Sequence, residues 1–200
     1  MTGSVEELAG SLPGWAGAVR RAAFHAIRRR EALDTPALAT RTGLSSAEVE
    51  TGLATLISRG MARRDGAGRV VMVGGLSLEP TRHQLVLSGE GLHTWCAADA
   101  VGIPAALGED AVVRTTCPHC GRTIEIEIRL GEHREAHTFV VWLPSKTCSS
   151  VVDEFCPEVN LFCDASHLEA WRTTSGDPPG TGLSVAQVVE LGRRWWAEFR

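Results

Sequence analysis

The stretch Trp95-Cys96-Ala97-Ala98-Asp99 is the most informative part of this 200-residue chain. A cysteine and a carboxylate three residues apart lie on one face when the segment is helical, so we expect a helix over residues 91–100 that presents both groups together. A second cysteine after an aromatic residue, Phe155-Cys156, follows sixty residues later. If the fold brings them together, two thiols and one acid suit chemistry on a thiophilic metal, because thiolates bind soft metals and a carboxyl group transfers protons.

The composition is that of an ordinary globular chain. The hydrophobic content is 44%, the charged content is 22% and the net charge is −4, so a core can form and no overall basic footprint for nucleic acid is present. The first residues do not follow a secretory pattern, and no apolar run approaches the ~18 residues of a membrane span. We therefore expect a cytoplasmic protein with no membrane partner. Its six cysteines are then expected to serve metal binding or catalysis rather than disulfides.

Residues 1–78, which contain no cysteine, predict a winged helix-turn-helix-like lobe. A helical stretch over residues 5–33 is broken at Pro13-Gly14, and a short helix follows from Thr35-Pro36. A third helix, over residues 45–58, opens with a Ser45–Glu48 capping box, and a hairpin is expected over residues 63–73. This third helix would be the recognition helix, yet it contains no Arg, Lys, Asn or Gln to read base edges. That absence argues against DNA binding and favours a structural role.

Residues 79–200 read as a mixed or antiparallel sheet core flanked by helices, which makes the whole chain α+β. The expected helices beyond residues 91–100 cover residues 147–155, 166–172 and 184–199. The expected extended segments cover residues 75–87, 111–116, 123–130, 137–143 and 159–163. A loop is expected over residues 177–180, where Pro178-Pro179-Gly180 interrupts the pattern.

The run Cys117-Pro118-His119-Cys120-Gly121 has the form of a knuckle that presents two sulfurs to one zinc ion. A full structural zinc site needs about two more ligands, and no second C-x-x-C is present. A redox dithiol is an equal alternative for Cys117 and Cys120, and coincidence a weaker one. We expect Cys148 and Cys163 to be core residues. The remaining candidates for further ligands are Cys148, Cys156, Cys163, His133 and His137.

These features together resemble the organomercurial lyase (alkylmercury lyase) family over nearly the whole chain. The resemblance is carried by residues 92–99, 104–108, 111–117 and 155–162, then by Trp171 and a C-terminal helix. It implies protonolysis of a carbon–mercury bond in an organomercurial substrate, giving a hydrocarbon and Hg(II). Carried over residue by residue, Cys96 and Cys156 would be the mercury-binding thiols, and Asp99 would mediate protonation of the leaving carbon. Cys117 matches a further family cysteine that has a structural role.

The resemblance also implies that no organic cofactor is needed. Product Hg(II) would stay on Cys96 and Cys156 until small thiols or a mercury reductase accept it. The chain departs from the family in having Cys156-Pro157-Glu158, where a Cys-Cys pair or a His-rich stretch is common, and in having Cys120. The alternative function is therefore a non-catalytic, thiol-based metal-binding protein derived from this family, a metal sensor or a metallochaperone.

Overall fold

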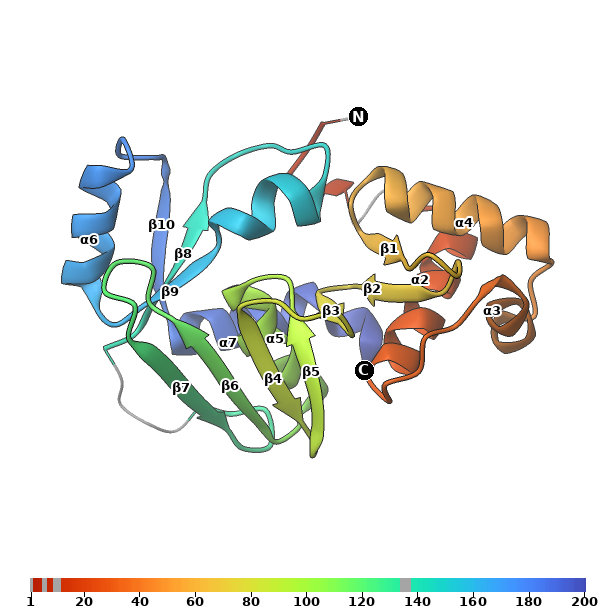
Figure 1. Ribbon diagram of the computed structural model, residues 1–200, viewed down its shortest axis with the longest axis horizontal. Coiled ribbons are helices and arrows are strands. Elements are labelled where there is room, and N and C mark those ends of the chain that lie inside the picture. The colour runs from red at the N-terminus through yellow and green to blue at the C-terminus, as the bar shows by residue number, and fades with distance from the viewer. Residues whose placement is uncertain (1, 5–6, 9–11, 134–137) are drawn as a thin grey trace.

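Two antiparallel sheets and the helices packed against them form a mixed α+β structure (Figure 1). The computed structural model describes residues 2–4, 7–8, 12–133 and 138–200. The larger sheet has seven strands in the order β1-β2-β3-β5-β4-β6-β7, and the smaller has three in the order β10-β8-β9. Every pairing between these strands is antiparallel. The α+β class with an antiparallel sheet is therefore confirmed.

The N-terminal elements follow the predicted order of three helices and a hairpin. They are α2 (Gly14–Ile27), α3 (Thr35–Thr42), α4 (Ser46–Ser58), β1 (Ala62–Arg64) and β2 (Val70–Val73). The predicted capping box is present, since Ser45 and Glu48 exchange side-chain-to-backbone bonds at the start of α4. Of the predicted helical stretch over residues 5–33, the part after the break at Pro13-Gly14 is α2, which ends at Ile27. Residues 7–8 are also helical, and residues 5–6 and 9–11 lie outside the described residues. The winged-helix assignment itself stays a prediction.

The centre of the large sheet contains one important difference from the sequence prediction. Its remaining strands are β3 (Leu76–Ser77), β4 (His83–Leu87), β5 (Glu90–Thr94), β6 (Ala111–Thr116) and β7 (Thr123–Ile128). The helix predicted over residues 91–100 is wrong in its first half, because residues 90–94 pair with both β3 and β4. Helix α5 (Ala97–Leu107) then continues through Pro104, past the predicted end. Tertiary burial of nearly the whole helix outweighs the hydrogen bond that proline cannot donate.

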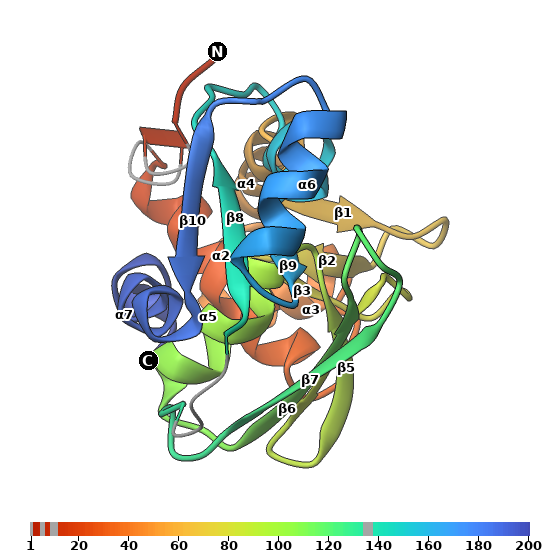
Figure 2. The same ribbon diagram turned by 90° about the vertical axis from the view of Figure 1, so that its left-hand side faces the viewer.

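Helix α5 packs on the large sheet, and α7 (Val185–Trp195) packs against α5 and against the small sheet (Figures 1 and 2). Two glycines permit their close approach, because a Cβ on Gly192 would lie 2.3 Å from the Cα of Gly102. The same contact fixes the C-terminal aromatic residues, since the ring of Trp196 also lies against Gly102. None of the helices in the described part of the chain combines the length and apolar character that a bilayer crossing requires.

The small sheet and α6 lie at the opposite end of the molecule from α2–α4 (Figure 1). Its strands are β8 (Val140–Pro144), β9 (Asn160–Phe162) and β10 (Gly180–Ser184), and α6 (Ala165–Thr174) contacts β8 and β9 (Figure 2). The loop predicted over residues 177–180 leads into β10, a strand that the prediction missed. The helix predicted over residues 147–155 is a single π-helical turn, η1 (Val151–Phe155), followed by the 3₁₀ turn η2 (Cys156–Glu158). His137, the first residue of a predicted strand, lies outside the described residues.

Candidate functional site

Cys96 and Asp99 are held together by the first turn of α5. Cys96 is the N-cap residue, with an extended backbone (φ −149°, ψ 175°). Its N–H donates to the Asp99 carboxylate at 2.9 Å, and its sulfur takes the place of the usual Ser or Thr oxygen in a capping box. The prediction of a mid-helix cysteine is therefore wrong, because β5 occupies the residues before it. The three-residue spacing still unites the two groups, through cap geometry rather than through a shared helix face.

Cys156 lies beside Cys96 and Asp99, on the segment that leads into the small sheet. The π-helical turn η1 ends at Phe155, and Cys156 opens the 3₁₀ turn that leads into β9. The backbone N–H of Ala97 donates to the carbonyl of Val159 at 3.3 Å, which ties the two cysteine-bearing segments together. One ligand atom from each of Cys96, Asp99 and Cys156 lies within 4.8 Å of the other two, and all three residues are buried. The fold thus brings together the three residues that the sequence singled out.

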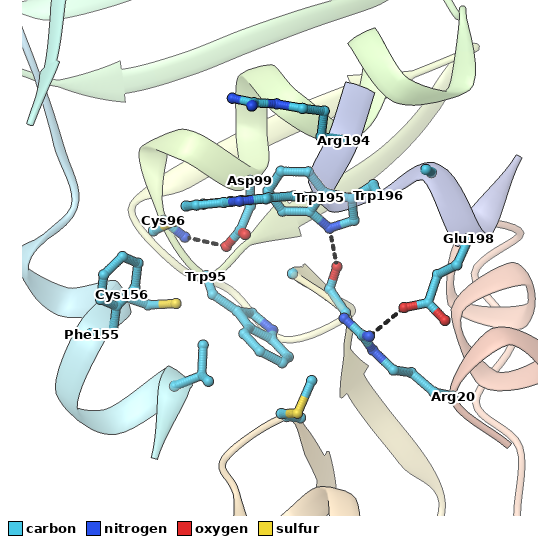
Figure 3. A pocket seen from close by; sticks show the side chains of 15 residues that line it. Arg20, Trp95, Cys96, Asp99, Phe155, Cys156, Arg194, Trp195, Trp196 and Glu198 are labelled. Carbon is cyan, nitrogen blue, oxygen red and sulfur yellow. Dashed lines mark hydrogen bonds and ion pairs between the residues drawn. The ribbon is translucent and has the colours of Figure 1, made fainter. Parts of the chain in front are cut away.

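These groups line a cavity of about 460 Å³ (Figure 3). Its wall is mostly apolar and includes four aromatic side chains, and its polar lining includes Arg20, which forms an ion pair with Glu198. The aromatic lining residues are Trp95, Phe155, Trp195 and Trp196. A mostly apolar cavity with a few convergent polar groups is the usual form of a small-molecule site. This one fits a small apolar group lying beside two thiols.

Two tryptophans of the wall are fixed by the same short backbone segment. The indole N–H of Trp196 donates to the carbonyl of Gly74 at 2.8 Å, and that of Trp95 donates to the carbonyl of Leu76 at 3.0 Å. The N–H of Trp95 also donates to the carbonyl of Gly75 at 3.0 Å. The segment from the β2–β3 turn into β3 therefore positions both tryptophans of the wall. Sequence patterns gave no sign of this, because backbone carbonyls have no residue signature.

Burial changes the proton affinity of all three groups. Burial raises the pKa of Asp99 to about 7, although its bonds from Cys96 and the charge of Arg20 act in the opposite direction. Burial likewise raises the pKa of the Cys96 thiol. A hydrogen bond with Cys96, together with burial, raises the pKa of Cys156 further. Near neutral pH the site therefore contains two protonated thiols and a carboxyl group able to gain or lose a proton.

A second cluster lies away from the cavity and contains both cysteines of the knuckle. One ligand atom from each of Cys117, Cys120, Cys163 and His167 lies within 4.8 Å of the others. Cys163 is buried in the core as predicted, and its sulfur also lies 3.7 Å from that of Cys120, so it joins the cluster as one of the further ligands considered above. His167 was missed, although its position four residues after Cys163 was the available signal.

The other ligand candidates do not join the second cluster. Cys148 is fully buried and lies outside both clusters, as predicted for a core cysteine. Cys156 belongs to the cavity, and His133 is not one of the four clustered side chains. His137 lies outside the described residues. The two clusters therefore divide five of the six cysteines between the cavity and a group near the surface.

Comparisons with known proteins agree on one family. The family model described as MerB, alkylmercury lyase, matches residues 76–197. An alkylmercury lyase of Bacillus cereus is 34% identical over 160 residues, which cover 78% of this chain and 70% of that protein. One of Staphylococcus epidermidis is 30% identical over 165 residues, covering 81% and 74%. The crystal structure of the mercury-bound form of MerB2 is similar with a TM-score of 0.89, at 25% identity, over 97% of this chain and 95% of that one.

Proposed function

The chain belongs to the alkylmercury lyase family, and on that premise we propose that it cleaves the carbon–mercury bond of an organomercurial by protonolysis. The products are a hydrocarbon and Hg(II). The observation that carries the proposal is the placement of two thiols and one carboxyl group within 4.8 Å of one another, buried beside an apolar cavity. The similarity to a MerB2 structure that contains mercury supports the same site chemistry.

Binding begins at a thiol. Hg(II) is soft and thiophilic, so the substrate R–Hg⁺ bonds to the sulfur of Cys96, and the thiol proton of Cys96 is released to solvent. The organic group R then lies against the aromatic wall, where burial of apolar surface holds it. Because the thiols are neutral before the substrate arrives, the empty cavity does not have to hold two buried thiolates.

Protonation of carbon completes the cleavage. As the sulfur of Cys156 bonds to mercury, electron density moves onto the organic group and makes its carbon basic. Neutral Asp99 gives its proton to that carbon, and the electron pair of the carbon–mercury bond becomes the carbon–hydrogen bond. The thiol proton of Cys156 passes to the Asp99 carboxylate and restores the acid. The balance is R–Hg–S(Cys96) plus HS(Cys156) giving R–H plus S(Cys96)–Hg–S(Cys156).

Release requires an outside acceptor for mercury. Small thiols, or a mercury reductase, exchange with the two protein sulfurs and take Hg(II) away. No step in this sequence needs an organic cofactor. Asp99 and both thiols then return to their starting protonation states, so the enzyme turns over.

We propose a structural role for residues 1–78 as a winged-helix-like lobe, with residues 79–200 as the catalytic part. In support, the carbonyls of Arg59 and Gly60 accept the N–H groups of Val151 and Val152 at 3.0 and 3.1 Å. These bonds connect the end of α4 to the π-helical turn that precedes Cys156. The lobe would thus fix the position of Cys156 in the cavity, a structural role that requires no DNA.

The test is detection of the hydrocarbon. Reduced protein is incubated with phenylmercury acetate and excess small thiol, and benzene is followed by gas chromatography. We expect repeated turnovers in the wild type and a fall of about 10² to 10⁴-fold in Asp99→Asn, which retains the cap acceptor but has no transferable acid proton. Stoichiometric mercury capture without benzene would overturn the lyase and favour the metal-binding alternative.

A further inference from the structure

We propose that Cys117, Cys120, Cys163 and His167 form a structural zinc site that is separate from the thiol–carboxyl cavity. Three sulfurs and one imidazole nitrogen make a complete ligand set for tetrahedral Zn²⁺. The set comes from two distant parts of the sequence, the β6–β7 turn and the β9–α6 junction. A closed set of four protein ligands is the mark of a structural rather than a catalytic zinc.

The distances between the ligand atoms fit a tetrahedron around zinc. With Zn–S bonds of about 2.3 Å and a Zn–N bond of about 2.0 Å, tetrahedral edges are about 3.8 Å between sulfurs and about 3.5 Å between sulfur and nitrogen. The sulfurs of Cys120 and Cys163 are 3.7 Å apart, and the sulfur of Cys117 lies 3.6 Å from Nδ1 of His167. A disulfide, by contrast, requires sulfurs about 2.05 Å apart.

The first ligand pair is preformed by a tight turn. The N–H of Gly121 donates to the carbonyl of Cys117, and the N–H of Cys117 donates to the carbonyl of Arg122, both at 2.9 Å. Gly121 has a φ of +72°, a conformation that glycine adopts without strain. The chain therefore bends back directly after Cys120, and both sulfurs turn toward the same point.

The second ligand pair is fixed by the cap of α6. The Asp164 carboxylate accepts the N–H of His167 at 2.9 Å, so His167 lies in the first turn of the helix. Cys163 lies between the last residue of β9 and this cap residue. Cys163 and Cys117 are buried and His167 is half-buried, whereas Cys120 is exposed. An ion could therefore enter from the side of Cys120 and be enclosed by the other three ligands.

Zinc at this point would connect the two sheets. Cys117 and Cys120 belong to the end of the seven-stranded sheet, while Cys163 and His167 belong to the strand and helix of the three-stranded sheet. The zinc site would fix the end of β9, the strand that begins four residues after Cys156. We therefore infer that zinc stabilises the arrangement of the two sheets and so the approach of Cys156 to Cys96.

The metal itself is the first measurement. Protein purified in reducing buffer without added metal or chelator is analysed by plasma mass spectrometry, and we expect about one zinc per chain. Replacing zinc with Co²⁺ should give the intense visible bands of tetrahedral cobalt and a near-ultraviolet thiolate charge-transfer band. Removal of zinc by a chelator should lower the melting temperature, and adding zinc back should restore it.

Ligand variants decide whether these four residues bind the ion. Cys120→Ser and His167→Ala should lose most of the zinc, whereas Cys148→Ser, which removes a buried thiol outside both clusters, should retain it. Cys96→Ser should also retain zinc, which separates this site from the cavity. If a variant does not fold, cobalt titration of the wild type still tests the ligand set. The proposal would be overturned by absence of zinc with no tetrahedral cobalt spectrum, by a Cys120–Cys163 disulfide that persists in protein purified in reducing buffer, or by zinc retained in both ligand variants.

Discussion

Gly75 lies against the carboxyl group of Asp99 so closely that no side chain fits between them. A Cβ at position 75 would lie 2.7 Å from Oδ1 and 2.8 Å from Cγ of Asp99. Gly75 also has a φ of +94°, which residues with a Cβ rarely adopt. The turn between β2 and β3 therefore presses bare backbone against the proposed acid. This contact restrains the carboxyl group at Oδ1, whereas Oδ2 accepts the N–H of Cys96.

Replacing Gly75 with alanine should displace Asp99 and lower activity. The strained backbone alone costs about 1–3 kcal/mol, and the new methyl group must push the carboxyl away from the cavity. A shift of about 1 Å in a reacting group can cost about 100-fold in rate. We expect benzene release in Gly75→Ala to fall by roughly that factor, measured with phenylmercury. Gly89→Ala is the matched control, because Gly89 also has a positive φ, +90°, and nothing lies within 4 Å of its added Cβ.

Loss of either cavity thiol should abolish turnover. Serine oxygen is a hard, poor ligand for Hg(II), so Cys96→Ser and Cys156→Ser each leave only one soft ligand. Benzene release should fall to background in both, while Cys148→Ser should keep most of the wild-type rate. Mercury binding, followed by mass spectrometry of the protein, should weaken in both cavity variants. Normal turnover in either one would exclude its role as a mercury ligand.

The rate should fall as the pH rises above about 7. Burial raises the pKa of Asp99 to about 7, and the proposed proton donor is its neutral form. Above that pH the carboxyl group loses its proton and kcat/KM decreases about tenfold per pH unit. Asp99→Asn has no proton to lose, so its residual activity should not show this decrease above pH 7. An unchanged pH profile in Asp99→Asn would assign the decrease to another group.

The raised pKa of Asp99 should also lower the stability of the folded state at alkaline pH, where the buried carboxyl group is ionised. In the folded state the group keeps its proton up to about pH 7, whereas its ordinary value is 3.8. The folded state therefore binds more protons than the unfolded state between these values, and stability decreases as the pH rises through that window. Asp99→Asn removes this pH-dependent loss of stability. Urea unfolding at pH 5 and pH 8 should show a smaller decrease for the variant than for the wild type.

Gly192 should be needed for the contact between α5 and α7. Alanine normally favours a helix over glycine by about 1 kcal/mol, but a Cβ here would lie 2.3 Å from the Cα of Gly102. Overpacking typically costs about 1–3 kcal/mol, so the steric effect should prevail and lower the melting temperature. Gly14→Ala, at the start of α2, has nothing within 4 Å of its new Cβ and should not lower it. Equal melting temperatures in the two variants would contradict the close helix contact.

Local sequence patterns predicted much of the secondary structure because each depends on neighbouring residues. The capping box at Ser45 and Glu48 forms as expected. The alternation of Ile124, Ile126 and Ile128 does give a strand with one buried face. Residues 90–94 were misread because their strand depends on pairing with β3 and β4. Strand β10 was missed because its Gly-Thr-Gly sequence gains order only by pairing with β8.

For the two clusters, the sequence determined which residue types were available and which near neighbours would meet. Trp95-Cys96-Ala97-Ala98-Asp99 and the Cys117–Cys120 pair are close along the chain, so short-range geometry holds each pair together. Only the tertiary structure decided that Cys156 would complete the first cluster, since the distance between Cys96 and Cys156 depends on how the two sheets pack. Burial of Asp99 and the joining of Cys163 and His167 to the knuckle were decided in the same way. These features arise from contacts between segments far apart in sequence, and no spacing along the chain encodes them.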